Sequence, residues 1–212
     1  MSRSLTGAII ALAFVCASSA GLLAIRSKTE EKPTPKKPAA TLADEALNRG
    51  MKRLETAERL EAGDPKGARK EFEAAVKDLK IATANAPDNY RAHNALGYSY
   101  RKIGNYTRAL ESYDRALTLA PGFAEAIEYR AEAFLGLNRI DEAKNAYMQL
   151  FVADRTASNV LLKAMKTWVG KRRVEPAGVD AATLDAFAAW VTERDGLAMS
   201  VGNLGHNSPD WK

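Results

Sequence analysis

Residues 90–121, with the sequence YRAHNALGYSYRKIGNYTRALESYDRALTLAP, contain the spacing that decides the fold. Apolar and small side chains recur every three or four residues in two successive runs, as in two helices that are each buried along one side. Between the runs, Gly104 and Asn105 predict a short turn, and Asn105 suits an N-cap because its side-chain oxygen accepts hydrogen bonds from free N–H groups. Pro121 ends the second run, since its ring cannot continue a helix. The stretch therefore predicts a helical hairpin.

The order of side-chain sizes in this hairpin is more specific than its periodicity. Small residues alternate with bulky ones, which would let two helix backbones approach closely while tyrosines fill the space around them. This order resembles the tetratricopeptide repeat, a hairpin of about 34 residues with the pattern W-x2-L-G-x2-Y, then A-x3-F, then P. We call that spacing the repeat length. The resemblance implies packing roles for His93, in the place of the Trp, and for Leu96, Gly97, Tyr100, Ala109, Tyr113, Ala116 and Pro121.

The same pattern returns one repeat length later, in residues 124–155. The packing positions are refilled in kind by Ile127, Ala131, Phe134, Ala143 and Tyr147. Two positions depart from the pattern, because Arg130 stands in the place of Leu96 and Arg155 in the place of Pro121. Arg130 predicts a looser hairpin, or a side chain that covers apolar surface with its stem.

Residues 41–87 are expected to form a longer, degenerate hairpin. The second helix of the repeat is recognisable one repeat length earlier, in Ala75, Leu79, Ala82 and Pro87. A first helix before it would bury Leu47, Met51 and Leu54 along one side. Both helices are several residues longer than a repeat requires, which predicts an elongated hairpin with its tip at residues 63–67.

Residues 156–196 are expected to cap the array. Leu161, Ala164, Met165 and Trp168 lie one repeat length after the matching positions of the preceding repeat. They predict a helix over residues 156–169, which would cover the exposed face of the last hairpin, as solenoids require. A loop over residues 170–180 would follow, and Asp180 would cap a last helix over residues 181–193.

Together these features predict an all-α fold, a short right-handed solenoid of helical hairpins like that of tetratricopeptide repeats, with a C-terminal capping pair of helices. The expected organisation is a signal peptide or transmembrane anchor (1–25), a linker rich in Pro and Lys (26–40), the degenerate hairpin (41–87), two repeats (88–155), capping helices (156–196) and a flexible tail (197–212).

Residues 5–25 contain no charged side chain and are almost entirely apolar or small. One interpretation is a cleavable signal peptide, with Arg3 before the apolar run and cleavage after Ala20. The other is an uncleaved anchor, since an apolar segment of this length can span a bilayer. Both favour an exported or membrane-anchored domain, in the bacterial periplasm or inner membrane. Alternatively, the basic flank of an uncleaved anchor would keep the domain in the cytoplasm.

Most of the net positive charge of the chain comes from its N-terminal segments. Of the formal net charge of +5, Arg3 contributes +1 and residues 26–40 contribute +3, which leaves +1 for residues 41–212. A nearly neutral domain does not support nucleic-acid binding, and we expect no nucleic-acid partner. The single cysteine, Cys16, excludes an internal disulfide.

The resemblance implies a protein-binding function. In tetratricopeptide repeats, the first helices of successive hairpins line a concave groove that holds a peptide or helix of another protein. The groove would be basic in one repeat and acidic in the next, which suits a partner segment with charges of both signs. The family's clamp for chaperone C-termini needs Lys, Asn and Arg at set places, two of which Ala95 and Glu125 occupy, so we do not expect chaperone docking. The matching outward positions here are Arg91, Asn94, Tyr98, Arg101, Lys102, Glu125, Glu128, Glu132, Leu162 and Lys166.

A catalytic role is the alternative hypothesis. His93 with Glu125, Glu128 and Glu132 would form a metal-dependent or hydrolytic site. Because His93 occupies a packing position and nothing positions a second set of ligands, the favoured interpretation is a scaffold or assembly adaptor without catalytic residues, metal or cofactor. A third hypothesis is self-association into a homo-oligomer through exposed repeat ends.

Overall fold

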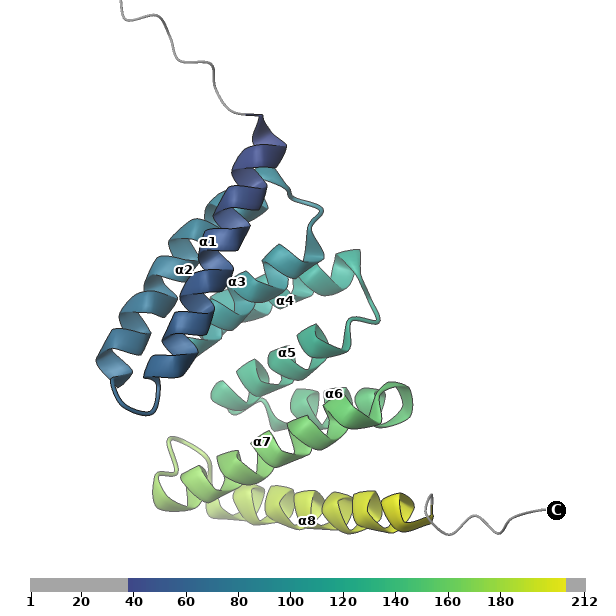
Figure 1. Cartoon of the computed structure of the whole chain (residues 1–212). Helices are drawn as coiled ribbons and strands as arrows, with labels where there is room; N and C mark the ends of the chain where they lie inside the picture. Colours follow the sequence, from purple (N-terminus) through teal and green to yellow (C-terminus); the bar gives the residue numbers. More distant parts are fainter. Residues whose placement is uncertain (1–37, 205–212) are drawn as a thin grey trace, which may run out of the picture. The chain divides into compact units, whose positions relative to one another are not determined.

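The computed structural model describes residues 38–204, and side chains up to residue 198 (Figure 1). This part of the chain is all-α, as predicted, and contains no strand. The predicted signal peptide or anchor and most of the linker lie outside the described residues. Among the helices that are described, none is long and apolar enough to cross a membrane. The eight helices of residues 38–204 are α1 (Ala39–Leu60), α2 (Pro65–Asn85), α3 (Tyr90–Lys102), α4 (Tyr106–Leu119), α5 (Ala124–Gly136), α6 (Ile140–Ala153), α7 (Arg155–Val174) and α8 (Ala181–Leu204).

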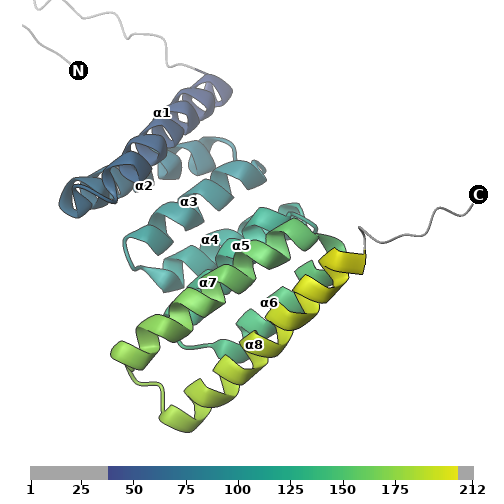
Figure 2. The ribbon, with the colours of Figure 1, turned by 60° about the horizontal axis from the view of Figure 1, so that its bottom comes forward.

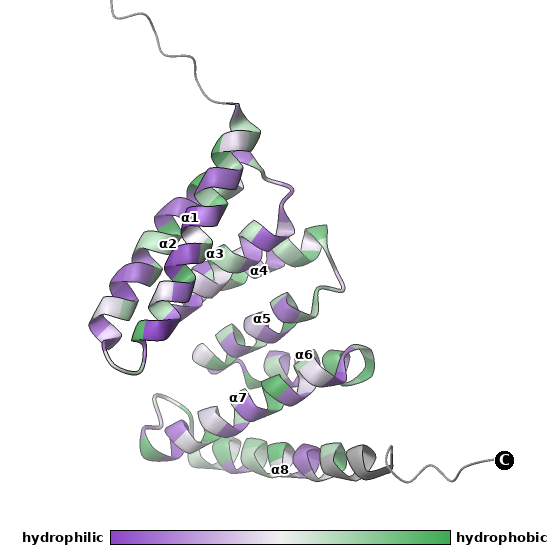
Figure 3. Cartoon of the chain, viewed as in Figure 1, coloured by the Kyte–Doolittle hydropathy of each residue, from purple (hydrophilic) through white to green (hydrophobic). Residues whose placement is uncertain are grey.

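Successive helices of this part pair into four hairpins, and each hairpin packs on the next (Figures 1 and 2). The first helices of the hairpins also meet directly, since α1 contacts α3, α3 contacts α5 and α5 contacts α7. We call the side that these four helices share the inner face. Hydrophobic and hydrophilic residues alternate along the helices, as expected where only one side is buried (Figure 3). The prediction of a solenoid of helical hairpins is confirmed.

Short polar side chains start most of these helices. The predicted N-cap Asn105 accepts a hydrogen bond from the backbone N–H of Arg108, and Asp64 accepts one from Gly67. Asp180 accepts from Thr183 at 2.9 Å, as expected for the start of α8. Asn89 and Asp154 cap α3 and α7 in the same way. Each cap satisfies an N–H group that has no partner within its helix.

Glycines mark where the two helices of a hairpin cross most closely. A Cβ atom added at Gly97 would lie 2.6 Å from the ring of Tyr113, and one added at Gly50 would lie 2.6 Å from Leu79. Leu79 and Tyr113 are one repeat length apart, so Gly50 occupies in the first hairpin the position that Gly97 occupies in the second. The sequence pattern did not reveal this role of Gly50.

The register of α1 corrects the expectation for its buried side. Leu54 is buried, but Leu47 is only partly buried and Met51 is 43% exposed. The reason is that Gly50, rather than Met51, meets Leu79 of α2, so α1 is turned with Met51 away from α2. The first hairpin is elongated as predicted, because α1 and α2 have 22 and 21 residues against 13 and 14 in α3 and α4.

The expected packing residues differ in burial. His93 and Phe134 are partly buried, and Pro121 is exposed just beyond the last residue of α4. Arg130 covers the ring of Phe134, with its guanidinium carbon 5.7 Å from the ring centre, and donates to Asp114 at 2.8 Å. The positions that are buried are Leu96, Gly97, Tyr100, Ala109, Tyr113, Ala116, Ile127, Ala131, Ala143 and Tyr147.

The C-terminal helices are longer than predicted. Helix α7 continues through Gly170 to Val174, where we expected a loop from residue 170, and α8 continues to Leu204, where we expected a flexible tail from residue 197. A single glycine inside a helix costs only about 1 kcal/mol and does not by itself end it. The pair closes the array, because the indole N–H of Trp168 in α7 donates to the carbonyl of Leu135 in α5 at 2.7 Å. Residues 205–212 lie outside the described part.

Candidate peptide-binding groove

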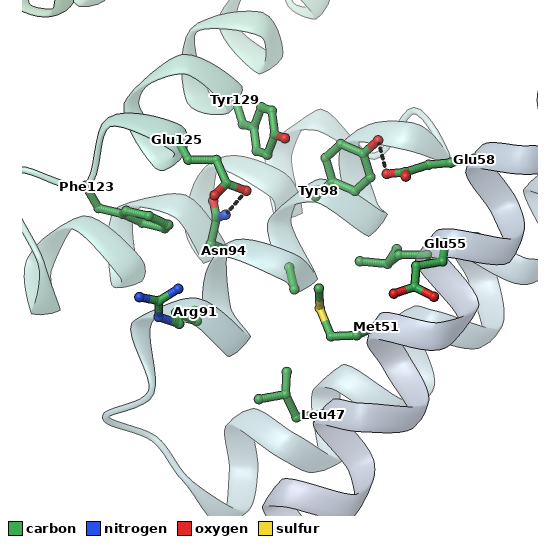
Figure 4. A pocket seen from close by; sticks show the side chains of 12 residues that line it. Leu47, Met51, Glu55, Glu58, Arg91, Asn94, Tyr98, Phe123, Glu125 and Tyr129 are labelled. Atoms are coloured by element: carbon green, nitrogen blue, oxygen red, sulfur yellow. Dashed lines mark hydrogen bonds between the residues drawn. The ribbon is translucent and has the colours of Figure 1, made fainter. Parts of the chain in front are cut away.

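Helices α1, α3 and α5 border a hollow of about 290 Å³ on the inner face, which we call the apolar recess (Figure 4). Met51 and Leu47 of α1 lie across it from Asn94 and Arg91 of α3, while Glu125 and Tyr129 approach from α5. Its apolar lining is Leu47, Met51, Leu54, Ala95, Tyr98, Phe123 and Tyr129, and its polar lining is Glu55, Glu58, Arg91, Asn94 and Glu125.

Tyr98 joins the helices around this recess. Its ring lies between Phe72, at a centroid distance of 6.1 Å, and Tyr129, at 5.1 Å. Its hydroxyl donates to Glu58 of α1 at 2.8 Å (Figure 4). Burial raises the pKa of this hydroxyl well above its usual range, and Glu58 raises it further. Tyr98 therefore stays protonated and keeps its hydrogen bond to α1 at physiological pH.

Asn94 has one half of its amide satisfied. Its Nδ2 group donates to Glu125 of α5 at 3.0 Å, which fixes the orientation of the amide. The Oδ1 atom is buried and accepts from no donor in the described part of the chain. Buried polar atoms of native proteins nearly always have partners, so this unpaired oxygen is an exception.

Glu128 is a second acceptor without a partner. It lies one repeat length after Asn94, at the equivalent position of the next repeat, and is only 7% exposed. Within residues 38–198, no side chain donates a hydrogen bond or forms an ion pair to it. Burial raises the pKa of its carboxyl to about 7, and the neighbouring charge of Glu132 contributes to the shift. The charge of Arg101 acts in the opposite direction and lowers this pKa, and Glu128 does not line the apolar recess.

Arg101 and Glu132 change the predicted charge pattern of the groove. They form an ion pair between α3 and α5, and the Arg101 guanidinium lies 5.1 Å from the ring of Tyr98 and 5.0 Å from that of Tyr129. Lys102 likewise pairs with Glu61 at the end of α1. Part of the expected alternation of a basic and an acidic repeat is therefore neutralised by ion pairs within the described domain.

A second hollow of about 600 Å³ lies beyond these ion pairs, and we call it the basic recess. Lys163, Lys171 and Arg172 of α7 line it, and none of them pairs with a carboxylate in the described residues. Its only carboxylates, among the described side chains, are Glu61 and Glu132, which are already paired. The inner face therefore carries excess negative charge in the apolar recess and excess positive charge in the basic recess.

The structure distributes nine of the ten predicted groove residues over three places, and the tenth, Glu128, lines none of them. Leu162 and Lys166 are not in either recess, since they line a separate hollow between α7 and α8, where Lys166 pairs with Asp195 at 2.5 Å. The apolar recess brings together Arg91, Asn94, Tyr98 and Glu125, and the basic recess brings together Arg101, Lys102 and Glu132.

Sequence reasoning missed the contribution of α1. Leu47, Met51, Glu55 and Glu58 line the apolar recess, yet only the role of Gly50 as the close-contact position would have revealed their orientation. Once Gly50 is aligned with Gly97, Leu47 corresponds to Asn94 and Met51 to Tyr98.

The structure does not assemble the alternative site at His93. Among the described residues, no group of three His, Cys, Asp or Glu side chains could hold a metal ion. The ring of His93 is instead engaged by the carbonyl oxygen of Pro87, 3.1 Å from its Nε2 atom. Glu125 accepts from Asn94 and Glu132 pairs with Arg101, so His93 and the glutamates form no common centre.

Stacked antiparallel hairpins with a shared, hollowed inner face define a helical-repeat protein. Within it, residues 58–124 match the family model of the tetratricopeptide repeat. No curated protein sequence matches the chain.

Solved tetratricopeptide-repeat structures are similar to the chain at low identity. The second such domain of human RPAP3, solved in complex with an HSP70 peptide, is 17% identical, with 58% of this chain and 98% of that chain covered and a TM-score of 0.46. The first domain of human RPAP3 is 15% identical, with 61% and 98% covered and a TM-score of 0.45. The TPR2B domain of yeast Sti1, in complex with pHsp70, is 15% identical, with 73% and 98% covered and a TM-score of 0.41.

Proposed function

We propose that this chain is a non-catalytic protein-interaction module that holds a peptide or helix of a partner protein on its inner face, as a scaffold or assembly adaptor. The observation that carries the proposal is the apolar recess, where Met51 stays 43% exposed among aromatic side chains on packed helices. Exposed apolar surface gathered in a hollow, with a few placed polar groups, is typical of binding sites. The match of residues 58–124 to the tetratricopeptide repeat supports it.

The proposal includes export or membrane attachment. Residues 5–25 supply the uncharged apolar segment that either a signal peptide or an anchor needs. We place the domain in the bacterial periplasm, free or tethered at the inner membrane, with the cytoplasmic orientation as the alternative. Sequencing of the mature N-terminus tests cleavage after Ala20, and an intact Met1 or Ser2 would contradict it. Protease accessibility in spheroplasts distinguishes the two orientations.

Capture of the partner tests the groove itself. The full-length chain would be crosslinked in cells, and the trapped protein identified by mass spectrometry. Met51→Glu places a charge in the apolar recess and is expected to abolish capture. The matched control is Met148→Glu on α6, which is 41% exposed and lies in neither recess. Circular dichroism should be the same for both variants. Undiminished capture by Met51→Glu would contradict the proposed function.

A further inference from the structure

The basic recess concentrates positive charge in a domain that is otherwise nearly neutral. Five basic side chains line it against two carboxylates, an excess of +3, whereas residues 41–212 together carry only +1. We infer that this recess accepts an acidic, extended segment of the partner protein, with two carboxylates four positions apart and an apolar side chain midway between them. This inference rests on the proposed function and adds the chemical class of the partner segment.

The cations without partners are accessible to a ligand. Lys163 and Lys171 are exposed side chains of α7 that line the recess, and neither forms an ion pair within residues 38–198. Arg172 lines the same recess and is half-buried, with its guanidinium carbon 5.2 Å from the ring centre of Trp168. The hydrogen bond of the indole N–H to the Leu135 carbonyl fixes that ring. Arg172 is thereby held at the recess, where its forked donors match a carboxylate.

The remaining charges of the recess cancel and leave these three cations in excess. Arg101 pairs with Glu132, and Lys102 pairs with Glu61. Like charges on the walls of one hollow repel one another until an anion enters it. Carboxylates of a partner relieve this repulsion and also accept charge-assisted hydrogen bonds, so an acidic segment is favoured on both counts.

The spacing of the cations sets the spacing of the carboxylates. Lys163 and Lys171 are eight residues apart on α7, a rise of about 12 Å. An extended chain advances about 3.3 Å per residue and turns alternate side chains to the same side, so carboxylates four positions apart lie about 13 Å apart on one face. Between the two lysines, Ala164 and Trp168 line the recess together with Leu135 of α5, which suits an apolar side chain at the middle position.

The shape of the recess favours a protein segment over other anions. A single phosphate ion is too small to bridge two lysines that are about 12 Å apart along their helix. A membrane surface is flat, whereas this lining comes from several helices, α3, α5 and α7 among them, around a hollow of about 600 Å³. Nucleic acid is disfavoured because residues 41–212 are nearly neutral as a whole.

The test uses the full-length chain and three pools of fluorescent nonapeptides. Their third and seventh residues are both glutamate, both glutamine or both lysine, the fifth is leucine, and the remaining positions vary between alanine and serine. Fluorescence anisotropy at low ionic strength should show the glutamate pool binding at least about tenfold tighter than the glutamine pool, as expected for one charge-assisted hydrogen bond, and the difference should shrink with added salt. Equal binding of the two pools, or binding of neither, would overturn the inference.

Two further ligands test the spacing and the class of partner. A glutamate pool with its two acidic residues adjacent should bind more weakly than the spaced pool, and equal binding would contradict the predicted spacing. A ten-nucleotide single-stranded DNA and vesicles of phosphatidylglycerol should not displace the spaced pool. Displacement by either at lower concentration than the unlabelled glutamate peptides would overturn the assignment to a protein segment.

Charge reversal connects the preference to its residues. Lys163→Glu and Lys171→Glu change exposed side chains, and each should weaken the glutamate pool about tenfold without changing the glutamine pool. The double variant should instead prefer the lysine pool, a gain of binding that misfolding cannot produce. The matched control is Lys80→Glu, at an exposed position of α2 that lines neither recess, and it should change neither pool. A glutamate preference that survives the double variant contradicts the assignment.

The outcomes separate this inference from the proposed function. If Met51→Glu abolishes capture in cells but the glutamate and glutamine pools bind alike, the groove is a binding site and only the acidic preference is wrong. If Met51→Glu leaves capture unchanged while the glutamate pool still depends on Lys163 and Lys171, the apolar recess is wrong as the carrier of the proposed function and the inference stands. A crosslink from Val160 to another part of the same chain, or to a second copy, would overturn the assignment to a partner protein.

Discussion

Glu128 shows how a single buried carboxyl couples folding to pH. Its pKa is about 7 in the folded chain, against an ordinary value near 4.5, because it is buried beside Glu132 and close to Glu125 and Asp154. The folded state therefore binds more protons than the unfolded state between these values, and the free energy of unfolding falls as pH rises from about 4.5 to 7. The stabilising contribution of the protonated form is complete below pH 4.5 and is lost above pH 7.

Replacement of this carboxyl by an amide, which does not titrate, should remove this fall in the free energy of unfolding. We expect Glu128→Gln to be more stable than the native chain by about 1–3 kcal/mol at pH 8, and by much less at pH 5. Urea unfolding at the two pH values measures the difference. Glu111→Gln serves as the control for removal of one negative charge at an exposed position. A gain that is equal at both pH values would show that titration of Glu128 is not its cause.

Gly97 carries a steric prediction at the same scale. A Cβ atom there would lie 2.6 Å from the ring of Tyr113, which is fully buried and has no room to move. We expect Gly97→Ala to cost about 1–3 kcal/mol by overpacking, although alanine favours a helix by about 1 kcal/mol. Gly170→Ala in α7 is the control, since no atom lies within 4 Å of its added Cβ, and it should stabilise. Thermal unfolding measures the melting temperatures of both variants. A melting temperature of Gly97→Ala equal to that of the native chain would show that α3 and α4 pack less closely at this point than described.

At the scale of the helices, Trp168 ties the capping pair to the repeats. Its indole N–H donates to the Leu135 carbonyl of α5 at 2.7 Å, and its ring packs edge-to-face on Phe187 of α8. We expect Trp168→Phe to cost about 0.5–1.5 kcal/mol, because the ring is largely replaced while the Leu135 carbonyl loses the indole donor and keeps the backbone N–H of Asn138 at 3.1 Å. Hydrogen exchange should quicken first in α7 and α8. In Trp190→Phe, which removes no such bond among the described residues, the loss should be smaller, and an equal loss would assign the effect to ring size.

The helices also show where sequence periodicity succeeds and fails. The hairpins over residues 88–155 were predictable because their small and bulky side chains recur at the repeat length, and that spacing is imposed by helix crossing. The register of the first hairpin was not predictable, since the stretch of chain from Gly50 to Leu79 is much longer than the stretch from Gly97 to Tyr113. Because of the additional residues between Gly50 and Leu79, the repeat spacing does not show which side of α1 faces α2. It therefore does not show that Met51 lies on the inner face.

At the scale of the whole described domain, the sequence predicts which residues lie on the candidate groove better than it predicts the charge that the groove presents. Repeat register places Asn94 and Glu128 on neighbouring inner helices without any coordinates. The neutralisation of Arg101 by Glu132, and the separation of an acidic from a basic recess, depend on how closely α3 approaches α5 and α7. These distances arise from the packing of several hairpins together, so no local pattern contains them.

This separation of charge predicts the direction in which a partner lies on the domain. Asn94 and Lys102 are slightly more than two turns apart on α3, a rise of about 12 Å, which about four residues of extended chain would span. The partner should therefore carry a cationic residue over the apolar recess and an acidic residue a few positions away over the basic recess, since complementary charges fix orientation.

Photocrosslinkers placed at Met51 and Val160 would measure this orientation. Met51 lines the apolar recess and Val160 the basic recess, and both are exposed enough to accept the probe. Mass spectrometry of the crosslinked peptides should place Met51 beside the basic part of the captured segment and Val160 beside the acidic part, only a few positions apart in the partner's sequence. If both probes reach the same partner residue, or the order is reversed, the two recesses do not bind one continuous segment in the manner that their charges require.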